Sequence, residues 1–183
     1  WSAWQPYATS ASWLLDGVSD GLKTVFVQFR DRATNVADPV TDTITLDRTP
    51  PSGVGVTVNG GLPYTTDPHV TLTLAATGAA QMRISNDGVT WIDWEPYATS
   101  RSWDVVGTSD GSKVVYAQFR DAAQNQSEVV QDGIILDRVG PTSGSIIIEG
   151  GQTCINQLNV ELALSATDAT GIVSSMRLSN DGA

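Results

Sequence analysis

Hydrophobic and polar residues alternate with a period of two in many short runs of this chain. In 54–58 and 70–74 every second residue is apolar, and in 114–120 the apolar residues Val115 and Phe119 share one face. Such alternation is typical of strands that bury one face, because successive side chains point to opposite sides. No segment shows the 3.6-residue period of an amphipathic helix. The chain is therefore predicted to be all-β.

Turn residues separate these runs at short intervals. The chain reads NGG at 59–61, NDG at 86–88 and SDG at 109–111, and tight turns favour Gly, Asn and Asp. About seven short strands in about 90 residues describe an antiparallel β-sandwich. We expect the strands of this unit near residues 54–58, 69–76 and 80–86, after Trp91, and near 102–106, 113–120 and 129–136.

Whole phrases recur along the chain with a period of 90 residues, which indicates a repeat protein. WQPYATS at 4–10 falls on WEPYATS at 94–100, and 27 of the first 48 residues are identical to those 90 positions later. Beyond residue 139 the shift stays at 90 until four inserted residues raise it to 94.

This pattern divides the chain into one whole repeat and two half repeats. Past the insertion, the MR of 82–83 matches the MR of 176–177. We therefore expect residues 49–138 to form a whole repeat. Residues 139–183 are then the front half of another repeat, and residues 1–48 are the back half of a third.

Three phrases in this arrangement resemble a known family. DRTPP at 47–51 opens the repeat, QFRDAAQN at 118–125 precedes its last strand, and LDR at 136–138 closes it. They resemble bacterial and archaeal immunoglobulin-like, fibronectin type III-like surface repeats, whose usual D-x-A-G-N-type loop here lacks its glycine. The resemblance implies tandem immunoglobulin-like sandwiches, with strands C′, E, F and G in 1–48 and strands A, B and C in 139–183.

The charge of the chain argues against some classes of partner. With 20 acidic and 10 basic residues the net charge is −10, whereas nucleic-acid binding needs a basic face and anionic membrane surfaces attract basic segments. No apolar run approaches the roughly 20 residues that span a bilayer. Because the first residue is Trp1 rather than Met, we expect that the natural chain does not start here.

Few residues could carry catalysis. His69 is the only histidine and Cys154 the only cysteine, and they fall in different repeats. Neither a Ser-His-Asp nor a Cys-His site is therefore expected. Glu95 becomes Gln5 in the other copy, so a carboxylate pair for glycoside hydrolysis is not repeated. We expect a protein that is not an enzyme.

The tryptophans have two interpretations. They recur in pairs: Trp1 with Trp91, Trp4 with Trp94, and Trp13 with Trp103. Indole faces suit sugar stacking, but a small sandwich also gains much from buried indole area. Trp103 alternates with Val105, which favours packing. Trp91 and Trp94 are three residues apart, so one of them is expected on the surface.

Acidic turn residues form the candidate metal site. Asp137 in the second linker should face Asp168 near the four-residue insertion, and Asp47 should face Asp121 at the other junction. Ca²⁺ takes six to eight oxygen ligands, which such loops supply. The alternative is that these are ordinary turn residues, because turns use Asp and Asn in any case.

The two half repeats need a partner that buries their apolar faces and pairs with their strand edges. Fragments of this size rarely bury enough apolar surface to fold alone, and they leave strand edges open. Either the chain is a window on a longer covalent repeat protein, or separate subunits complete each other as in donor-strand assembly. In both cases we expect 139–183 of one copy to pack with 1–48 of the next in a linear array.

These features predict a non-catalytic structural module of a prokaryotic stalk, adhesin, surface layer or filament on the cell surface. Short linkers that contain proline would limit bending between stacked sandwiches. The alternative, from a different class, is an accessory carbohydrate-binding module of a secreted enzyme, with a glycan as its partner.

Overall fold

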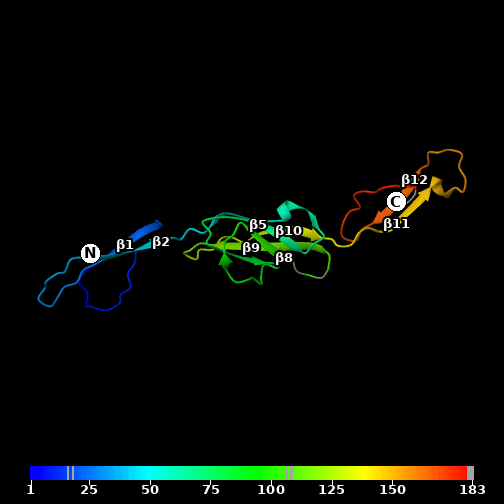
Figure 1. Ribbon diagram of the computed structural model, residues 1–183. Helices are drawn as coiled ribbons and strands as arrows, with labels where there is room; N and C mark the ends of the chain where they lie inside the picture. Colours follow the sequence, from blue (N-terminus) through cyan, green and yellow to red (C-terminus); the bar gives the residue numbers. More distant parts are fainter. Residues whose placement is uncertain (16, 18, 106, 108, 181–183) are drawn as a thin grey trace.

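The chain forms an elongated row of three β-rich parts (Figure 1). The computed structural model describes residues 1–15, 17, 19–105, 107 and 109–180. Within these ranges the helical residues form two single 3₁₀ turns, η1 (Asn59–Gly61) and η2 (Glu149–Gly151). The prediction of an all-β protein is confirmed.

The central part consists of two sheets. The larger sheet has, in spatial order, the strands β4 (Tyr64–Thr65), β10 (Val130–Leu136), β9 (Gly111–Arg120), β6 (Gln81–Ser85) and β7 (Glu95–Pro96). The smaller sheet has the order β3 (Ser52–Val58), β5 (His69–Thr77) and β8 (Ser100–Asp104). Paired strands are antiparallel except β4 and β10, which run parallel.

The two sheets enclose one hydrophobic core. Its buried apolar residues are Val56, Val58, Val70, Leu72, Leu74, Met82, Ile84, Val105, Val115, Ala117, Phe119, Ile134 and Leu136. Phe119 is fully buried, and the ring of Tyr97 meets it edge-on at 5.8 Å between ring centres. The Tyr97 hydroxyl accepts a hydrogen bond from the Ala76 amide of the opposite sheet. Burial of the apolar face of each alternating run therefore holds the sandwich together.

The seven strands expected in this part are all present near their predicted positions. The strand after Trp91 is short, and residue 106 of the expected strand 102–106 lies outside the described residues. An eighth strand, β4, was not expected, because two residues leave no periodic pattern. Backbone bonds tie it to β10: Ile135 N–H donates to the Pro63 carbonyl at 3.0 Å, and Asp137 N–H donates to the Thr65 carbonyl at 2.9 Å.

The N-terminal part contains one hairpin, β1 (Gly21–Val27) with β2 (Val40–Leu46). Its register is the register of β9 and β10 in the central part, shifted by 90 residues. Residues 1–15 form no strand. In the single chain these residues lack the pairing partners that strands C′ and E need, so the two strands stay a prediction for the assembled state.

The C-terminal part also contains one hairpin, β11 (Thr142–Ile148) with β12 (Leu162–Thr167). It has the register of β3 and β5, including an irregularity at the same place near the start of the first strand. Residues 172–180 form no strand in the single chain, so strand C also stays a prediction for the assembled state.

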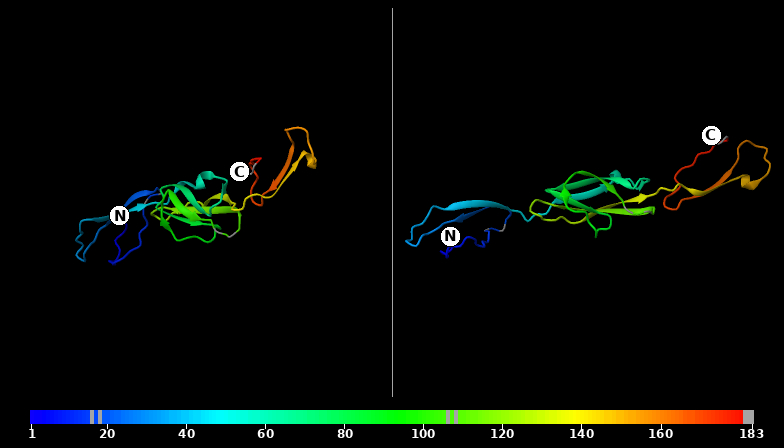
Figure 2. Two further views of the ribbon diagram at one scale, coloured as in Figure 1. Left: turned by 45° about the vertical axis from the view of Figure 1, so that its right-hand side comes forward. Right: turned by 60° about the horizontal axis from the view of Figure 1, so that its bottom comes forward.

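The missing strands share one cause, which is the absence of their pairing partners. In the central part, β6 pairs with β9 and β7, and β8 pairs with β5. The counterparts of these partners lie at opposite ends of the elongated chain (Figure 2). A strand without a neighbour leaves its backbone N–H and C=O groups unpaired. Only the strands whose partners lie in the same end part are therefore formed.

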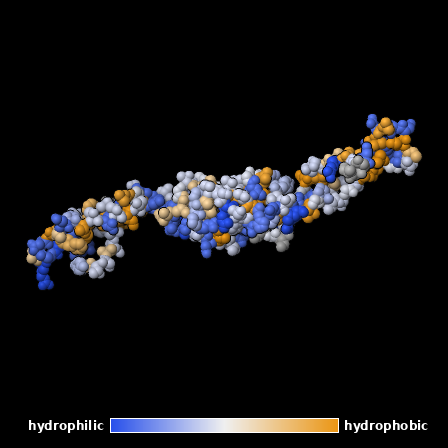
Figure 3. Space-filling model, in the orientation of Figure 1, coloured by the Kyte–Doolittle hydropathy of each residue, from blue (hydrophilic) through white to orange (hydrophobic). Residues whose placement is uncertain are grey.

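Both end parts leave apolar side chains on the surface (Figure 3). Phe29, just after β1, is 47% exposed, and Met176 in the C-terminal part is 71% exposed. On β11, Ile146 and Ile148 are each about half exposed. Contiguous exposed apolar patches usually mark contact surfaces.

Phe119 and Phe29 provide a matched test of where the core lies. Phe119→Ala should lower the free energy of unfolding of the central sandwich by about 3–5 kcal/mol, because it empties a packed site. Phe29→Ala, at the counterpart position, should change it by less than about 0.5 kcal/mol. Denaturant unfolding followed by circular dichroism in dilute solution measures both values. A small loss for Phe119→Ala would contradict the described core.

Candidate functional site

Each linker contains an arginine that is held by an aspartate just before β1 or β9, 28 residues earlier in the chain. The backbone N–H and the Nε of Arg138 donate to Asp110 at 2.8 and 2.7 Å. Arg48 donates in the same way to Asp20 at 2.9 and 2.8 Å. The arginine backbone N–H, followed by the guanidinium, holds the pKa of Asp110 below its ordinary value and lowers the pKa of Asp20 to about 2. These bonds fix the direction in which each linker leaves its sheet.

A second contact closes the first junction. The buried carboxylate of Asp121 accepts hydrogen bonds from the backbone N–H and the side-chain amide of Asn125, both at 2.9 Å. The Asn125 amide also donates to the backbone carbonyl of Asp47 at 3.0 Å. The structure thus brings Asp47 and Asp121 to one amide group. That amide nitrogen is a donor where Ca²⁺ would need an oxygen, so the arrangement fits a cation poorly.

Asp137 and Asp168 lie together at the second junction, on either side of Gly171. A Cβ atom at Gly171 would be 2.7 Å from Asp137 Oδ2 and 3.3 Å from Asp168 Oδ1. Asp168 Oδ1 also accepts hydrogen bonds from the backbone N–H groups of Thr170 and Gly171, at 3.0 and 2.7 Å. A side chain at this position would therefore require the carboxylate of Asp137 to move.

Two carboxylates supply fewer oxygens than Ca²⁺ needs. Among the described residues, no group of three or more His, Cys, Asp or Glu side chains lies close enough together to hold a metal ion. Further ligands would have to be backbone carbonyls, water or groups of a neighbouring copy. Calcium binding by Asp137 and Asp168 stays a prediction.

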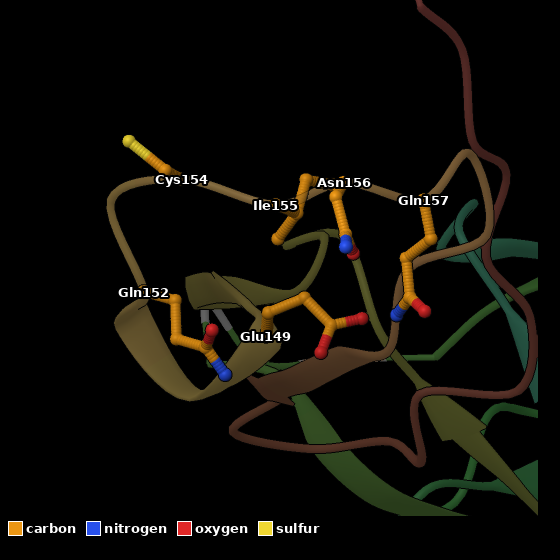
Figure 4. Close-up of a pocket in the computed structure, with 6 residues that line it drawn as sticks. All are labelled: Glu149, Gln152, Cys154, Ile155, Asn156 and Gln157. Atoms are coloured by element: carbon orange, nitrogen blue, oxygen red, sulfur yellow. The ribbon is translucent and has the colours of Figure 1, made fainter.

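The other chemically versatile residues stand apart from the junctions. The imidazole of His69 pairs with Asp104 on the surface, and this carboxylate raises the pKa of His69. Cys154 and Glu149 line the same open hollow, but the sulfur of Cys154 points away from that carboxylate (Figure 4). Neither arrangement places a nucleophile beside a base.

Two arginine and two tryptophan side chains stack in alternation next to β6 and β9. The guanidinium of Arg83 lies 4.8 Å from the ring centre of Trp91 and 4.7 Å from that of Trp94. The guanidinium of Arg120 lies 4.4 Å from the Trp94 ring. Arg83 also donates two hydrogen bonds to Gln118 Oε1, at 3.0 and 2.6 Å. Cation–π contacts thus engage Trp91 and Trp94, a role that the sequence did not reveal.

The N-terminal part contains counterparts of both tryptophans, of Gln118 and of Arg120. Arg30 lies 4.5 Å from the ring centre of Trp4. The side-chain amide of Gln28 donates to the carbonyl of Ala37 at 3.1 Å, and its counterpart in the central part makes the same bond. Trp1 is 80% exposed and Trp4 is 47% exposed. A counterpart of Arg83 is absent from this part of the chain.

The exposed apolar residues of the end parts occupy the positions of the central core. Each of the 13 buried apolar residues of that core has an apolar counterpart at a shift of 90 or 94 residues. None of these counterparts is buried. The C-terminal part holds Ile146, Ile148, Val160, Leu162, Leu164, Met176 and Leu178, and the N-terminal part holds Leu15, Val25, Val27, Phe29, Ile44 and Leu46.

Comparison of the sequence with known protein families gave no match, and comparison with curated proteins gave no significant similarity. Within the described residues, no helix has the length and apolar character needed to cross a membrane.

The carboxyl group of Asp20 should titrate at a lower pH than an ordinary aspartate does. Its pKa is about 2 instead of 3.8, so its bonds to Arg48 stabilise the junction above about pH 4 and are lost as the pH falls toward about 2. The backbone amide resonance of Arg48 should follow this change in NMR spectra, and Asp20→Asn should abolish it. A midpoint near pH 4 in the wild-type protein would show that the contact is not formed.

Calorimetric titration with CaCl₂ tests the metal prediction at the second junction. We expect binding of the wild-type chain at millimolar or lower Ca²⁺, the range of extracellular modules, and its loss in Asp168→Asn. A chelator should reverse any rise in melting temperature. Absence of binding heat at millimolar Ca²⁺ would leave Asp137 and Asp168 as turn residues only.

Proposed function

We propose that this chain is a non-catalytic structural module of a prokaryotic extracellular stalk, adhesin, surface layer or filament, and that it stacks head to tail into a linear array. The divided core carries this proposal. Seven core positions stand uncovered at one end of the chain and six at the other. Together they match the 13 buried apolar residues of the central sandwich.

The strand order supports a row of immunoglobulin-like domains. In the central part β3, β5 and β8 correspond to strands A, B and E, and β7, β6, β9 and β10 correspond to C′, C, F and G. This division into two sheets is typical of immunoglobulin-like sandwiches. The end hairpins have the registers of F with G and of A with B. Residues 1–48 and 139–183 would then be two halves of such a domain.

The segments without strands fit this arrangement. Between two copies, 175–179 would lie beside residues 26–30 of the neighbour, which include the end of β1, as β6 lies beside the last five residues of β9. Residues 10–14 would pair with residues 159–163 of the neighbour, as β8 pairs with the first five residues of β5. Residues 181–183, at the turn between the halves, lie outside the described residues. Each unpaired segment would gain the backbone partner that it lacks.

A contact between opposite ends of two chains can be repeated by each further chain. The two end parts lie at opposite ends of the chain (Figure 2), so a chain that has used one end still offers the other. Head-to-tail contacts that do not close generate filaments. Because the interface would be a domain core cut in two, we expect it to bury more than about 2,000 Å² in total, as in obligate assemblies.

The carbohydrate-binding alternative has less support. Sugar stacking needs an open aromatic face, but arginine guanidinium groups lie on the rings of Trp91 and Trp94. Trp103 is partly buried against the core, and its indole N–H donates to Asn86 at 2.9 Å. The tryptophans of the central part therefore act mainly in packing.

Sedimentation velocity over a range of concentrations tests the proposed stacking. The wild-type chain should form a ladder of oligomers that lengthens with concentration. Phe29→Asp and Met176→Asp should each abolish this growth, because each buries a charge in one half of the divided core. Val89→Asp, at a residue that is 82% exposed in the central part, should leave it unchanged. A wild-type chain that stays monomeric at high concentration would overturn the proposal.

A mixture of the two blocked variants tests polarity. Phe29→Asp leaves the C-terminal face intact, and Met176→Asp leaves the N-terminal face intact. Together they should form a discrete one-to-one dimer and nothing larger, because both remaining faces are blocked. Formation of longer species, or of no dimer, would contradict a head-to-tail interface between these two faces.

A further inference from the structure

We propose that Trp1, Trp4 and Gln28 form a socket for the guanidinium of Arg177 from a neighbouring copy. The inference rests on the proposed head-to-tail assembly and names the side chains that set its alignment. It assigns a partner to an exposed cation at one end of the chain and to two exposed indole rings at the other.

The central part shows the complete arrangement within one chain. Arg83 lies within 5 Å of the ring centres of Trp91 and Trp94, at 4.8 and 4.7 Å. Its Nε and Nη2 atoms both donate to Gln118 Oε1. The guanidinium is thus held by two aromatic rings and one carbonyl oxygen on the outer face of the sheet.

The socket in the N-terminal part repeats these groups 90 residues earlier. Trp1, Trp4 and Gln28 are the counterparts of Trp91, Trp94 and Gln118. Arg30 already lies against Trp4 at 4.5 Å, as Arg120 lies against Trp94. The amide of Gln28 is engaged by a backbone carbonyl, whereas no donor reaches its Oε1 within the described residues. The oxygen and both rings are therefore available to an arriving guanidinium.

Arg177 is placed to arrive there. It is exposed, and it makes no hydrogen bond, ion pair or ring contact within the described part of the chain. Its neighbours Met176 and Leu178 match the core residues Met82 and Ile84. If Met176 and Leu178 enter the shared core, strand alternation puts Arg177 on the outer face, where the socket lies.

Arginine suits this socket better than any other residue. Its planar guanidinium stacks on indole rings and still donates several hydrogen bonds in its own plane, whereas the compact ammonium of lysine is more strongly hydrated. A slip of the strand by two residues would bring Ser175 or Ser179 to the socket, and neither carries a cation. The socket would therefore select one register of pairing.

Substitution of Arg177 should weaken assembly without unfolding the chain. Two cation–π contacts and the bonds to Gln28 predict that Arg177→Ala raises the concentration for half-assembly about tenfold or more. Arg177→Lys should recover only part of this loss. Arg83→Ala is the matched control, because it should lower the melting temperature of the central sandwich and leave the half-assembly concentration within about twofold. Both quantities are measured on the full chain by sedimentation and by circular dichroism.

A double-mutant cycle separates the socket from the assembly as a whole. Arg177→Ala and Trp4→Leu should be non-additive, since each removes the same contact. Arg177→Ala and Trp13→Leu should be additive, because the counterpart of Trp13 binds Asn86 and not Arg83. Additive losses of assembly for Arg177→Ala and Trp4→Leu would overturn the proposed socket but not the proposed assembly. An unchanged half-assembly concentration for Arg177→Ala would have the same meaning. A wild-type chain that does not associate would overturn the proposed function itself.

Discussion

A β-strand with one apolar face needs a neighbour along its edge and a second sheet against that face, and the whole structure depends on this requirement. The central part meets it fully, with eight strands in two sheets around Phe119 and its neighbours. The end parts meet it only along one edge, as β1 with β2 and as β11 with β12. Their remaining segments stay without strands, and their apolar faces stay exposed.

Local patterns were enough to predict most of the central fold. Alternation and turn residues located its strands, because each strand there finds the partner that its pattern implies. The same patterns recur in residues 1–15 and 172–180, which form no strand in the single chain. The difference is non-local: a strand forms only where a partner is within reach, and sequence alternation contains no information about that. The short strand β4 was not predicted for a simpler reason, since two residues are too few to show an alternation of apolar and polar side chains.

The candidate site was partly predictable for similar reasons. Asp137 and Asp168 were expected to face each other because loops at one pole of a sandwich converge, and in the structure both lie near Gly171. The contacts of Arg83 were missed because its partners lie up to 35 residues away and depend on strand pairing. The sequence nevertheless contained a sign of these contacts. Arginine, glutamine and both tryptophans recur together across the repeats, and packing of the hydrophobic core alone does not require this recurrence.

The linkers leave the central part at opposite ends, and β3 and β10 run along the line between them (Figure 1). A pulling force applied through the linkers would act along the axes of these strands. The hydrogen bonds of β3 with β5 and of β10 with β9 and β4 would then be loaded in shear, so many must break at once instead of one after another. The parallel pair β4–β10 adds bonds at the end where the load leaves the domain. The fold therefore has the geometry of a part that carries tension.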